Sequence, residues 1–223
     1  MWCVPVLTDE YVCRMEDVLR LYEAPYNPSE PVVCLDERPV QLLDDVRESR
    51  RVSDGSLRRD YEYRRCGTAN IFCGVEPLGG RHFTKVTPTR DRFEFAEMLR
   101  EIAAAYPDAK HIHLVMDNLS THGKSSLLAA FDELTANRLW KRFRPHYTPK
   151  HGSWLNQAEI EISLVSRECL GKRRLSSIPA LREQLRAWNK DANRRKRMIQ
   201  WRFTRRKART LFGYSTKVMR VKD

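Results

Sequence analysis

Two short apolar runs, each ending in an aspartate, constrain the fold of this chain more than any other feature. Residues 31–36 read PVVCLD and residues 111–117 read HIHLVMD. A continuous apolar run of this length is typical of a strand that is buried on both faces, as in sheets covered by helices. The sequence therefore predicts two central strands with Asp36 and Asp117 at their carboxyl ends. If the strands are parallel neighbours, both carboxylates reach the same edge of the sheet.

The remaining pattern alternates between strand and helix signals, which predicts an α/β fold with a mixed central sheet flanked by helices. Gly and Pro punctuate the segments. The expected elements are a helix over 9–23, a polar loop over 48–66, a hairpin of strands 69–75 and 82–87, a helix from 90 to about 106 with Thr89 as N-cap, a helix over 124–139, a strand over 142–147, a helix opening near Asn156, and helical structure over 178–213.

Positive charge is concentrated near the end of the chain. The net charge is +12, and residues 171–210 hold fifteen Lys or Arg against two acids. Such a block is the expected footprint of a polyanion such as DNA, because Lys and Arg neutralise phosphates. A solvated helix face or a disordered tail is the alternative, but Trp188, Trp201 and Phe203 interrupt the block and favour a folded basic region.

The cysteines and the hydropathy exclude other classes of protein. None of the six cysteines forms a C-x-x-C pair, so a zinc site of the usual spacing is not expected, and Cys34 and Cys73 are predicted to be reduced core residues. No run of about 18 apolar residues exists, so no membrane span is expected. The start of the chain lacks the basic lead of a signal peptide, and a cytoplasmic, nucleoid-associated protein is expected.

Three acids in the chain suit a metal-dependent site, although each has another explanation. Mg²⁺ prefers oxygen ligands, and a pair of ions about 3.5–4 Å apart promotes displacement at phosphorus. Asp36 could instead begin a turn, and Asp117 could cap the following helix. Glu159 lies three residues after Asn156, close to the pattern of a capping box. Position alone leaves these alternatives open.

The strings that hold these acids resemble one transposase family. VVCLDE (32–37), LVMDNLSTHG (114–123) and YTPKHGSWLNQAEIEIS (147–163) are similar to the IS630 family, part of the IS630/Tc1/mariner superfamily of DDE transposases. Further segments also resemble the corresponding segments of this family, and the similarity covers nearly the whole chain. These segments are EYVCRMEDVLRLYEAPYNP (10–28), DYEYRRCGTANIFCGVEPLGGRHF (60–83) and IQWRFTRRKAR (199–209).

The resemblance implies an RNase H-like fold and a DNA transposase. Asp36, Asp117 and Glu159 would be the catalytic, metal-binding triad, with two Mg²⁺ ions per site and Mn²⁺ as a possible substitute. The reaction would be cleavage at transposon ends followed by strand transfer into target DNA. Glu161 does not match the motif, and two residues along a helix turn it by about 200°, away from Glu159. The separation of Asp117 and Glu159 is longer than is usual in the superfamily.

The resemblance and the concentration of positive charge together predict which residues contact DNA. They are Asn118, His122, Lys150, His151, Lys172, Arg173, Arg174, Arg194, Arg195, Lys196 and Arg197. For His122 a structural hydrogen bond is an equal alternative. Trp154 is expected to be a packing residue rather than a base-stacking one.

The expected organisation is a linker helix over 1–30, a catalytic domain over 31–170 and a basic helical region over 171–223. No segment large enough for a helix-turn-helix precedes Asp36, so a fragment is expected whose sequence-specific binding of transposon ends is weak or absent. Transposition joins two DNA ends, which suggests a homodimer on DNA, and the family suggests TA target sites. Two other functions stay open: a non-catalytic DNA-binding or dimerising remnant, and an RNase H-like nuclease.

Overall fold

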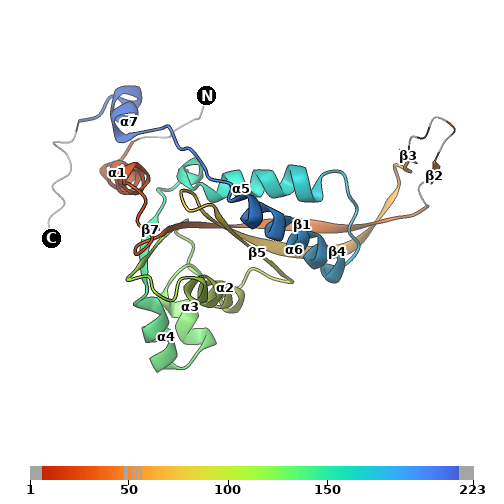
Figure 1. Ribbon diagram of the computed structural model, residues 1–223, viewed down its shortest axis with the longest axis horizontal. Coiled ribbons are helices and arrows are strands. Elements are labelled where there is room, and N and C mark those ends of the chain that lie inside the picture. Colours follow the sequence, from red (N-terminus) through yellow and green to blue (C-terminus); the bar gives the residue numbers. More distant parts are fainter. Residues whose placement is uncertain (1–6, 48–49, 52, 54, 56, 216–223) are drawn as a thin grey trace.

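A five-stranded mixed sheet forms the centre of the molecule (Figure 1), whose computed structural model describes residues 7–47, 50–51, 53, 55 and 57–215. The strand order is β5-β4-β1-β6-β7. The strands are β1 (Val32–Asp45), β4 (Tyr63–Glu76), β5 (Arg81–Thr87), β6 (Ile112–Met116) and β7 (Phe143–Tyr147). The predicted α/β class with helices on a mixed sheet is confirmed.

The two apolar runs are parallel neighbours, as predicted. Cys34 of β1 lies opposite Val115 of β6, and this register brings Asp36 beside Asp117. However, β1 does not end at Asp36; it continues to Asp45 and pairs with β4 in an antiparallel ladder. The prediction of a strand end at Asp36 is therefore wrong, because pairing with a distant strand extends β1 through a mixed polar sequence.

The predicted loop over 48–66 is largely the far end of this β1–β4 hairpin. β4 already begins at Tyr63, and the short pair β2 (Arg50–Arg51) and β3 (Leu57–Arg58) lies beyond it. The hairpin projects away from the rest of the molecule (Figure 1). The polar loop residues Glu48, Ser49, Asp54 and Ser56 are outside the described residues.

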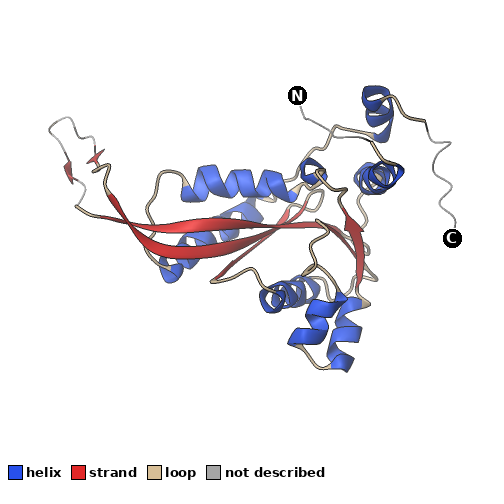
Figure 2. Ribbon diagram, turned by 180° about the vertical axis from the view of Figure 1, so that it is seen from behind, coloured by secondary structure: helices blue, strands red, loops and turns tan. Residues whose placement is uncertain are grey.

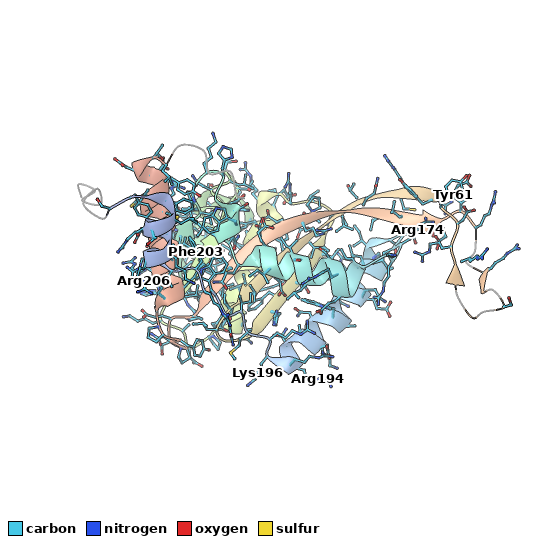
Figure 3. All side chains as sticks on the ribbon, turned by 90° about the horizontal axis from the view of Figure 1, so that it is seen from above. Tyr61, Arg174, Arg194, Lys196, Phe203 and Arg206 are labelled. Carbon is cyan, nitrogen blue, oxygen red and sulfur yellow. The ribbon has the colours of Figure 1, made fainter. Side chains whose placement is uncertain are left out.

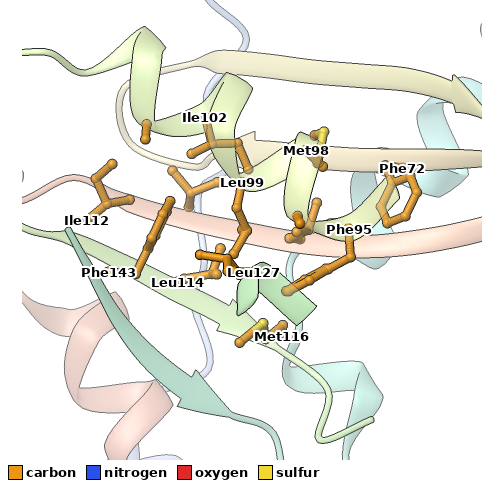
Figure 4. Packing of buried hydrophobic residues seen from close by; sticks show 14 of the residues in the cluster. Phe72, Phe95, Met98, Leu99, Ile102, Ile112, Leu114, Met116, Leu127 and Phe143 are labelled. Carbon is orange, nitrogen blue, oxygen red and sulfur yellow. The ribbon is translucent and has the colours of Figure 1, made fainter. Parts of the chain in front are cut away.

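One face of the sheet is covered by α2 (Arg92–Ala105), α3 (Lys124–Ala130) and α4 (Glu133–Trp140). Side chains from these helices interlock with Phe72, Leu114 and Phe143 of the strands (Figure 4). The N-cap of α2 is Asp91, whose carboxylate accepts bonds from the amides at 93 and 94, so the prediction of Thr89 is wrong. The helix predicted over 124–139 is interrupted, because Asp132 caps a new helix.

The opposite face carries α1 (Asp9–Glu23), α5 (Ala158–Leu164), α6 (Ile178–Arg195) and α7 (Arg205–Phe212), as Figure 2 shows from behind. A 3₁₀ turn (Ser153–Leu155) leads into α5, which continues as a π-helical turn (Val165–Leu170). The prediction of helix throughout 178–213 is only partly right. Lys196 ends α6 in a left-handed conformation (φ 47°), and residues 196–204 form a connection.

The prediction that Cys34 and Cys73 are reduced core residues is confirmed. Cys34 and Cys73 are buried and free, and burial raises the pKa of the Cys34 thiol to about 12. Cys3 is outside the described residues. Within the described part of the chain, no helix is both long enough and apolar enough to cross a membrane.

Candidate functional site

The first acid, Asp36, projects from the middle of β1 toward α5. Side chains alternate along a strand, and Cys34 packs against the α1 and α5 side whereas Leu35 packs against α2. Asp36 therefore shares the face of Cys34. Its Oδ1 accepts a 2.8 Å bond from the Glu37 amide, and its Oδ2 lies 3.4 Å from Nδ2 of Asn156. The carboxylate is thus oriented from both β1 and the segment before α5.

Other carboxylates surround Asp36 and change its acidity. Burial is the largest cause, and the negative charges of Glu159, Glu37 and Asp117 act in the same direction. Against the opposing bond from the Glu37 amide, these effects raise the pKa of Asp36 to about 7. A carboxyl group that resists ionisation beside other acids is stabilised as the anion by a nearby cation.

The second acid, Asp117, is the first residue beyond β6 and contacts a buried histidine. Its Oδ1 lies 2.6 Å from Nδ1 of His122, and Nε2 of His122 lies 2.8 Å from Glu37 Oε1. Burial disfavours the charged ring, but the carboxylates of Asp117 and Glu37 outweigh burial and raise the pKa of His122 to about 10. The imidazolium also stacks on Phe95 at 4.6 Å between centroids. His122 therefore links the strand of Asp36 to Asp117.

The third acid, Glu159, is exposed on the first turn of α5. No hydrogen bond holds its carboxylate among the residues that the structure describes. The capping-box alternative is not observed, because α5 follows Gln157 and has no side-chain cap. Asn156 instead donates a 2.9 Å bond to the Leu35 carbonyl and accepts one from the Ala158 amide. Asn156 thereby attaches the start of α5 to β1 beside Asp36.

Glu161, two residues further, points into the protein, as the helical geometry predicts. Its carboxylate is fully buried and lies 2.9 Å from Nδ1 of His82 on β5. Burial raises the pKa of Glu161, although the bond to His82 opposes that change. Asn193 of α6 holds both the backbone N–H and the carbonyl of His82. This contact fixes the rotation of α5 and leaves Glu159 on the outer side.

The three acids have the donor chemistry of a divalent-cation site. All are carboxylates, they approach from β1, β6 and α5, and their charges raise the pKa of Asp36. They do not close on a single point, since the described residues hold no group of three His, Cys, Asp or Glu side chains arranged to bind one ion. The chemistry of the donors fits a metal, and the carboxylates would have to approach one another to share it.

The structure separates the predicted DNA contacts into several places. Asn118 is exposed beside Asp117, whereas His122 is only 3% exposed. Lys150 and His151 border a cleft of about 330 Å³ that faces α1. Figure 3 shows Arg174 near the hairpin, Arg194 and Lys196 at the end of α6, and Arg206 on α7.

Several cations of the basic block are already paired within the chain. Arg174 pairs with Asp45 at 2.7 Å, and its guanidinium also donates to the backbone carbonyls of residues 60–62. These bonds leave few donors for a DNA phosphate. Arg194 and Arg195 both pair with Asp191. Arg197 pairs with Glu168, whereas Lys172 and Arg173 lie on an open surface beside Arg59. The block is therefore partly a set of intramolecular ties.

Two residues of this site, Glu37 and His82, were not predicted as site residues from the sequence, and they are the partners of His122 and Glu161. Asn156 was considered there only as a helix cap, whereas the structure has it contact the strand of Asp36. The signal for Glu37 is an acid directly after Asp36 inside a strand, where a second charge needs a partner. Nothing local identifies His82, because its partner is 79 residues away.

Solved structures with a similar fold include several complexes of the Mos1 transposase. The Mos1 mariner paired-end complex with Mn matches with a TM-score of 0.54 and 14% identity over 88% of this chain and 61% of that one. The Mos1 strand transfer complex matches with a TM-score of 0.55 and 14% identity over 88% and 60%. At this identity the likeness shows the fold, which is the RNase H-like catalytic fold of transposases. This chain spans about three fifths of those chains.

Sequence comparison gives the family. No functionally curated protein matches the chain. The family model described as DDE superfamily endonuclease matches residues 31–182, which include all three acids. That range is more than half of the 223 residues. The chain therefore belongs to the DDE superfamily of endonucleases.

Proposed function

We propose that this protein is the catalytic part of an IS630-type DNA transposase that cleaves transposon ends and joins them to target DNA. The observation that carries the proposal is that Asp36 lies beside Asp117 across the parallel strands β1 and β6, with Glu159 of α5 near enough for its charge to act on Asp36. Membership of the DDE endonuclease superfamily and the fold shared with Mos1 transposase complexes support it.

Asp36, Asp117 and Glu159 would hold Mg²⁺, with Mn²⁺ as a substitute, two ions to a site. Bound ions would lower the pKa of water or of a 3′-hydroxyl and neutralise charge at phosphorus. The residues of the chain prepare the site. The Glu37 amide and Asn156 orient Asp36, His122 holds Asp117, and the Glu161–His82 contact keeps Glu159 facing outward.

DNA is the proposed substrate, and exposed cations would neutralise its phosphates. Asn118, Lys150, His151, Lys172, Arg173 and Lys196 are the predicted contacts that the structure leaves accessible or on open surfaces. Arg194, Arg195 and Arg197 keep this proposed role only through donors that their ion pairs do not use. Arg174 would contact DNA only by giving up bonds to Asp45 or to the carbonyls of residues 60–62. Holding two DNA ends together would require a homodimer. The proposed target site is the dinucleotide TA, and the proposed cellular location is the nucleoid.

The decisive experiment is nicking of supercoiled plasmid DNA by the purified chain with Mg²⁺ or Mn²⁺. We expect metal-dependent nicking that falls by a factor on the order of 10² or more in Asp117→Asn, because the amide lacks the ligand charge. The matched control is Asp108→Asn, an exposed aspartate remote from the three acids in the fold. It should nick like the wild type.

Other outcomes separate the alternatives. Undiminished nicking by Asp117→Asn would disprove the site assignment. Salt-sensitive DNA binding without any nicking by the wild type would establish a non-catalytic DNA-binding remnant. Nicking without joining of a cleaved transposon end to target DNA would establish an RNase H-like nuclease.

A further inference from the structure

A large cleft opens directly beside Glu159. It has a volume of about 1080 Å³ and lies between α5 and the C-terminal segment 201–212. Glu159, Ile160 and Ser163 of α5 line one side. Four aromatic side chains also line it, namely Trp154, Trp201, Phe203 and Phe212, and we refer to it as the aromatic cleft.

Three of these four aromatic side chains contact one another, and the fourth, Trp201, contacts Tyr22. Trp154 meets Phe203 edge-on at 5.3 Å between centroids, and Phe203 meets Phe212 at 6.4 Å. Trp154 is packed in the cluster, as expected from the sequence, yet it also lines the cleft. All four rings are half-buried, so part of each faces the open space. Rigid, partly exposed rings are suited to stacking against flat ligands at small entropic cost.

Cationic side chains lie near the rings of the aromatic cleft, and the carboxylate of Glu159 that also lines it would be neutralised by a bound metal ion. Arg167 on the α5 side is exposed and has no ion-pair partner among the described residues. Figure 3 shows Arg206 at the same end of the molecule as Phe203, and Arg206 is exposed on α7. Cations beside a stacking surface are the usual combination in sites for single-stranded nucleic acid.

We propose that the aromatic cleft binds unpaired nucleotides of the DNA strand that runs past Glu159. This inference rests on the proposed function for its substrate, and it adds that the DNA is single-stranded next to the acids. The cleft is continuous with Glu159, so a strand entering the acidic site from this side crosses the rings. Stacking on rings accepts any base, so binding here depends little on sequence.

The test compares three DNA duplexes by fluorescence anisotropy, with a chelator present so that no cleavage occurs. One is blunt, one has a 3′ single-stranded overhang, and one has an overhang of abasic nucleotides of the same length. We expect the base-bearing overhang to bind about tenfold more tightly than either of the others, the ratio typical of stacking one base. The abasic overhang keeps the phosphates and therefore isolates the contribution of the bases.

The blocking variant is Ser163→Met, which puts a longer side chain into the cleft from an exposed position on α5. It should lose the preference for the overhang and keep the wild-type affinity for blunt DNA. Ser125→Met, an exposed serine on α3 across the sheet, is the matched control and should keep the preference. Phe203→Leu should reduce the preference severalfold, with a thermal melt to show that it is folded.

Equal binding of the abasic and base-bearing overhangs would overturn the proposal. An unchanged preference for the overhang in Ser163→Met would also overturn it. If Ser163→Met changed only the oligomeric state of the protein, the cleft would instead be assigned to binding a second copy of the chain. Plasmid nicking reports on the acids independently. Nicking without an overhang preference rejects only the cleft, and a preference without nicking rejects only the catalytic proposal.

Discussion

At the residue scale, His122 shows how the site is held together. Two acids reach its two ring nitrogens, at 2.6 Å from Asp117 and 2.8 Å from Glu37, and Glu37 is only 4% exposed. A charged ring between two carboxylates offsets the cost of burying the Glu37 carboxylate. The structural alternative from the sequence describes His122 better than a DNA contact does, since 3% exposure leaves little surface for a phosphate.

We predict that His122→Asn lowers the free energy of unfolding by about 2–4 kcal/mol, because Glu37 is then buried without a cation. His151→Asn is the matched control, since His151 is exposed and asparagine tolerates its positive φ of 63°. Urea denaturation measures both. A loss of DNA affinity in His122→Asn with unchanged stability would contradict this role and restore the DNA contact.

At the element scale, the sequence predicts element types well and boundaries less well. Continuous apolar runs identified β1 and β6, and periodicity identified α1 within its observed bounds. The end of β1 at Asp45 was missed because the ladder with β4 is non-local. The split at Phe131 was missed because the capping of α4 by Asp132 competes with a continuous helical pattern.

One contact between elements makes a sharp prediction. Gly80, in the β4–β5 turn, has φ +65°, and a Cβ there would lie 2.7 Å from the backbone of Lys196. Gly213, which ends α7, has φ +67° and open space around it. Both Gly→Ala changes incur left-handed strain of about 1 kcal/mol. Only Gly80→Ala also displaces the end of α6.

We therefore expect Gly80→Ala to lower the free energy of unfolding by about 2–4 kcal/mol and Gly213→Ala by about 1 kcal/mol. Urea denaturation of the two variants gives the difference directly. Equal losses would mean that the β4–β5 turn gives way without disturbing Lys196.

At the scale of the whole molecule, the first helix, α1, is tied to the last helix, α7. Glu16 of α1 binds Arg209 of α7 through two bonds of 2.7 and 2.8 Å and accepts a third from Tyr214. Burial alone would raise the pKa of Glu16, but Arg209 and Tyr214 outweigh it and lower the pKa below its ordinary value. Glu16 and Arg209 are 193 positions apart, so no local sequence pattern predicts this contact. Several arginines of the basic block over residues 171–210 are therefore engaged in contacts within the protein and are not free to bind phosphates.

This tie predicts a pH dependence of stability. A carboxyl group with a lowered pKa in the folded state contributes stability above its unfolded pKa and loses it as the pH falls through the folded value. Wild type should therefore exceed Glu16→Gln by about 1–2 kcal/mol at pH 7. The advantage should persist to about pH 4.5 and shrink at lower pH. Urea unfolding of both proteins across this range measures it, and a pH-independent difference would exclude the linkage.

The continuation of β1 beyond Asp36 has a mechanical consequence. The acid stands on the inner part of an arm whose outer part reaches about 30 Å further, at roughly 3.3 Å a residue. The ladder is irregular between Leu42 and Leu43, opposite Gly67 with its φ of 109°. Just beyond this irregularity the Leu43 amide donates a 3.0 Å bond to the Leu175 carbonyl, and Arg174 pairs with Asp45, so the outer arm is braced against the segment that leads into α6. A molecule that contacts the hairpin therefore acts on that segment as well as on the strand that carries Asp36.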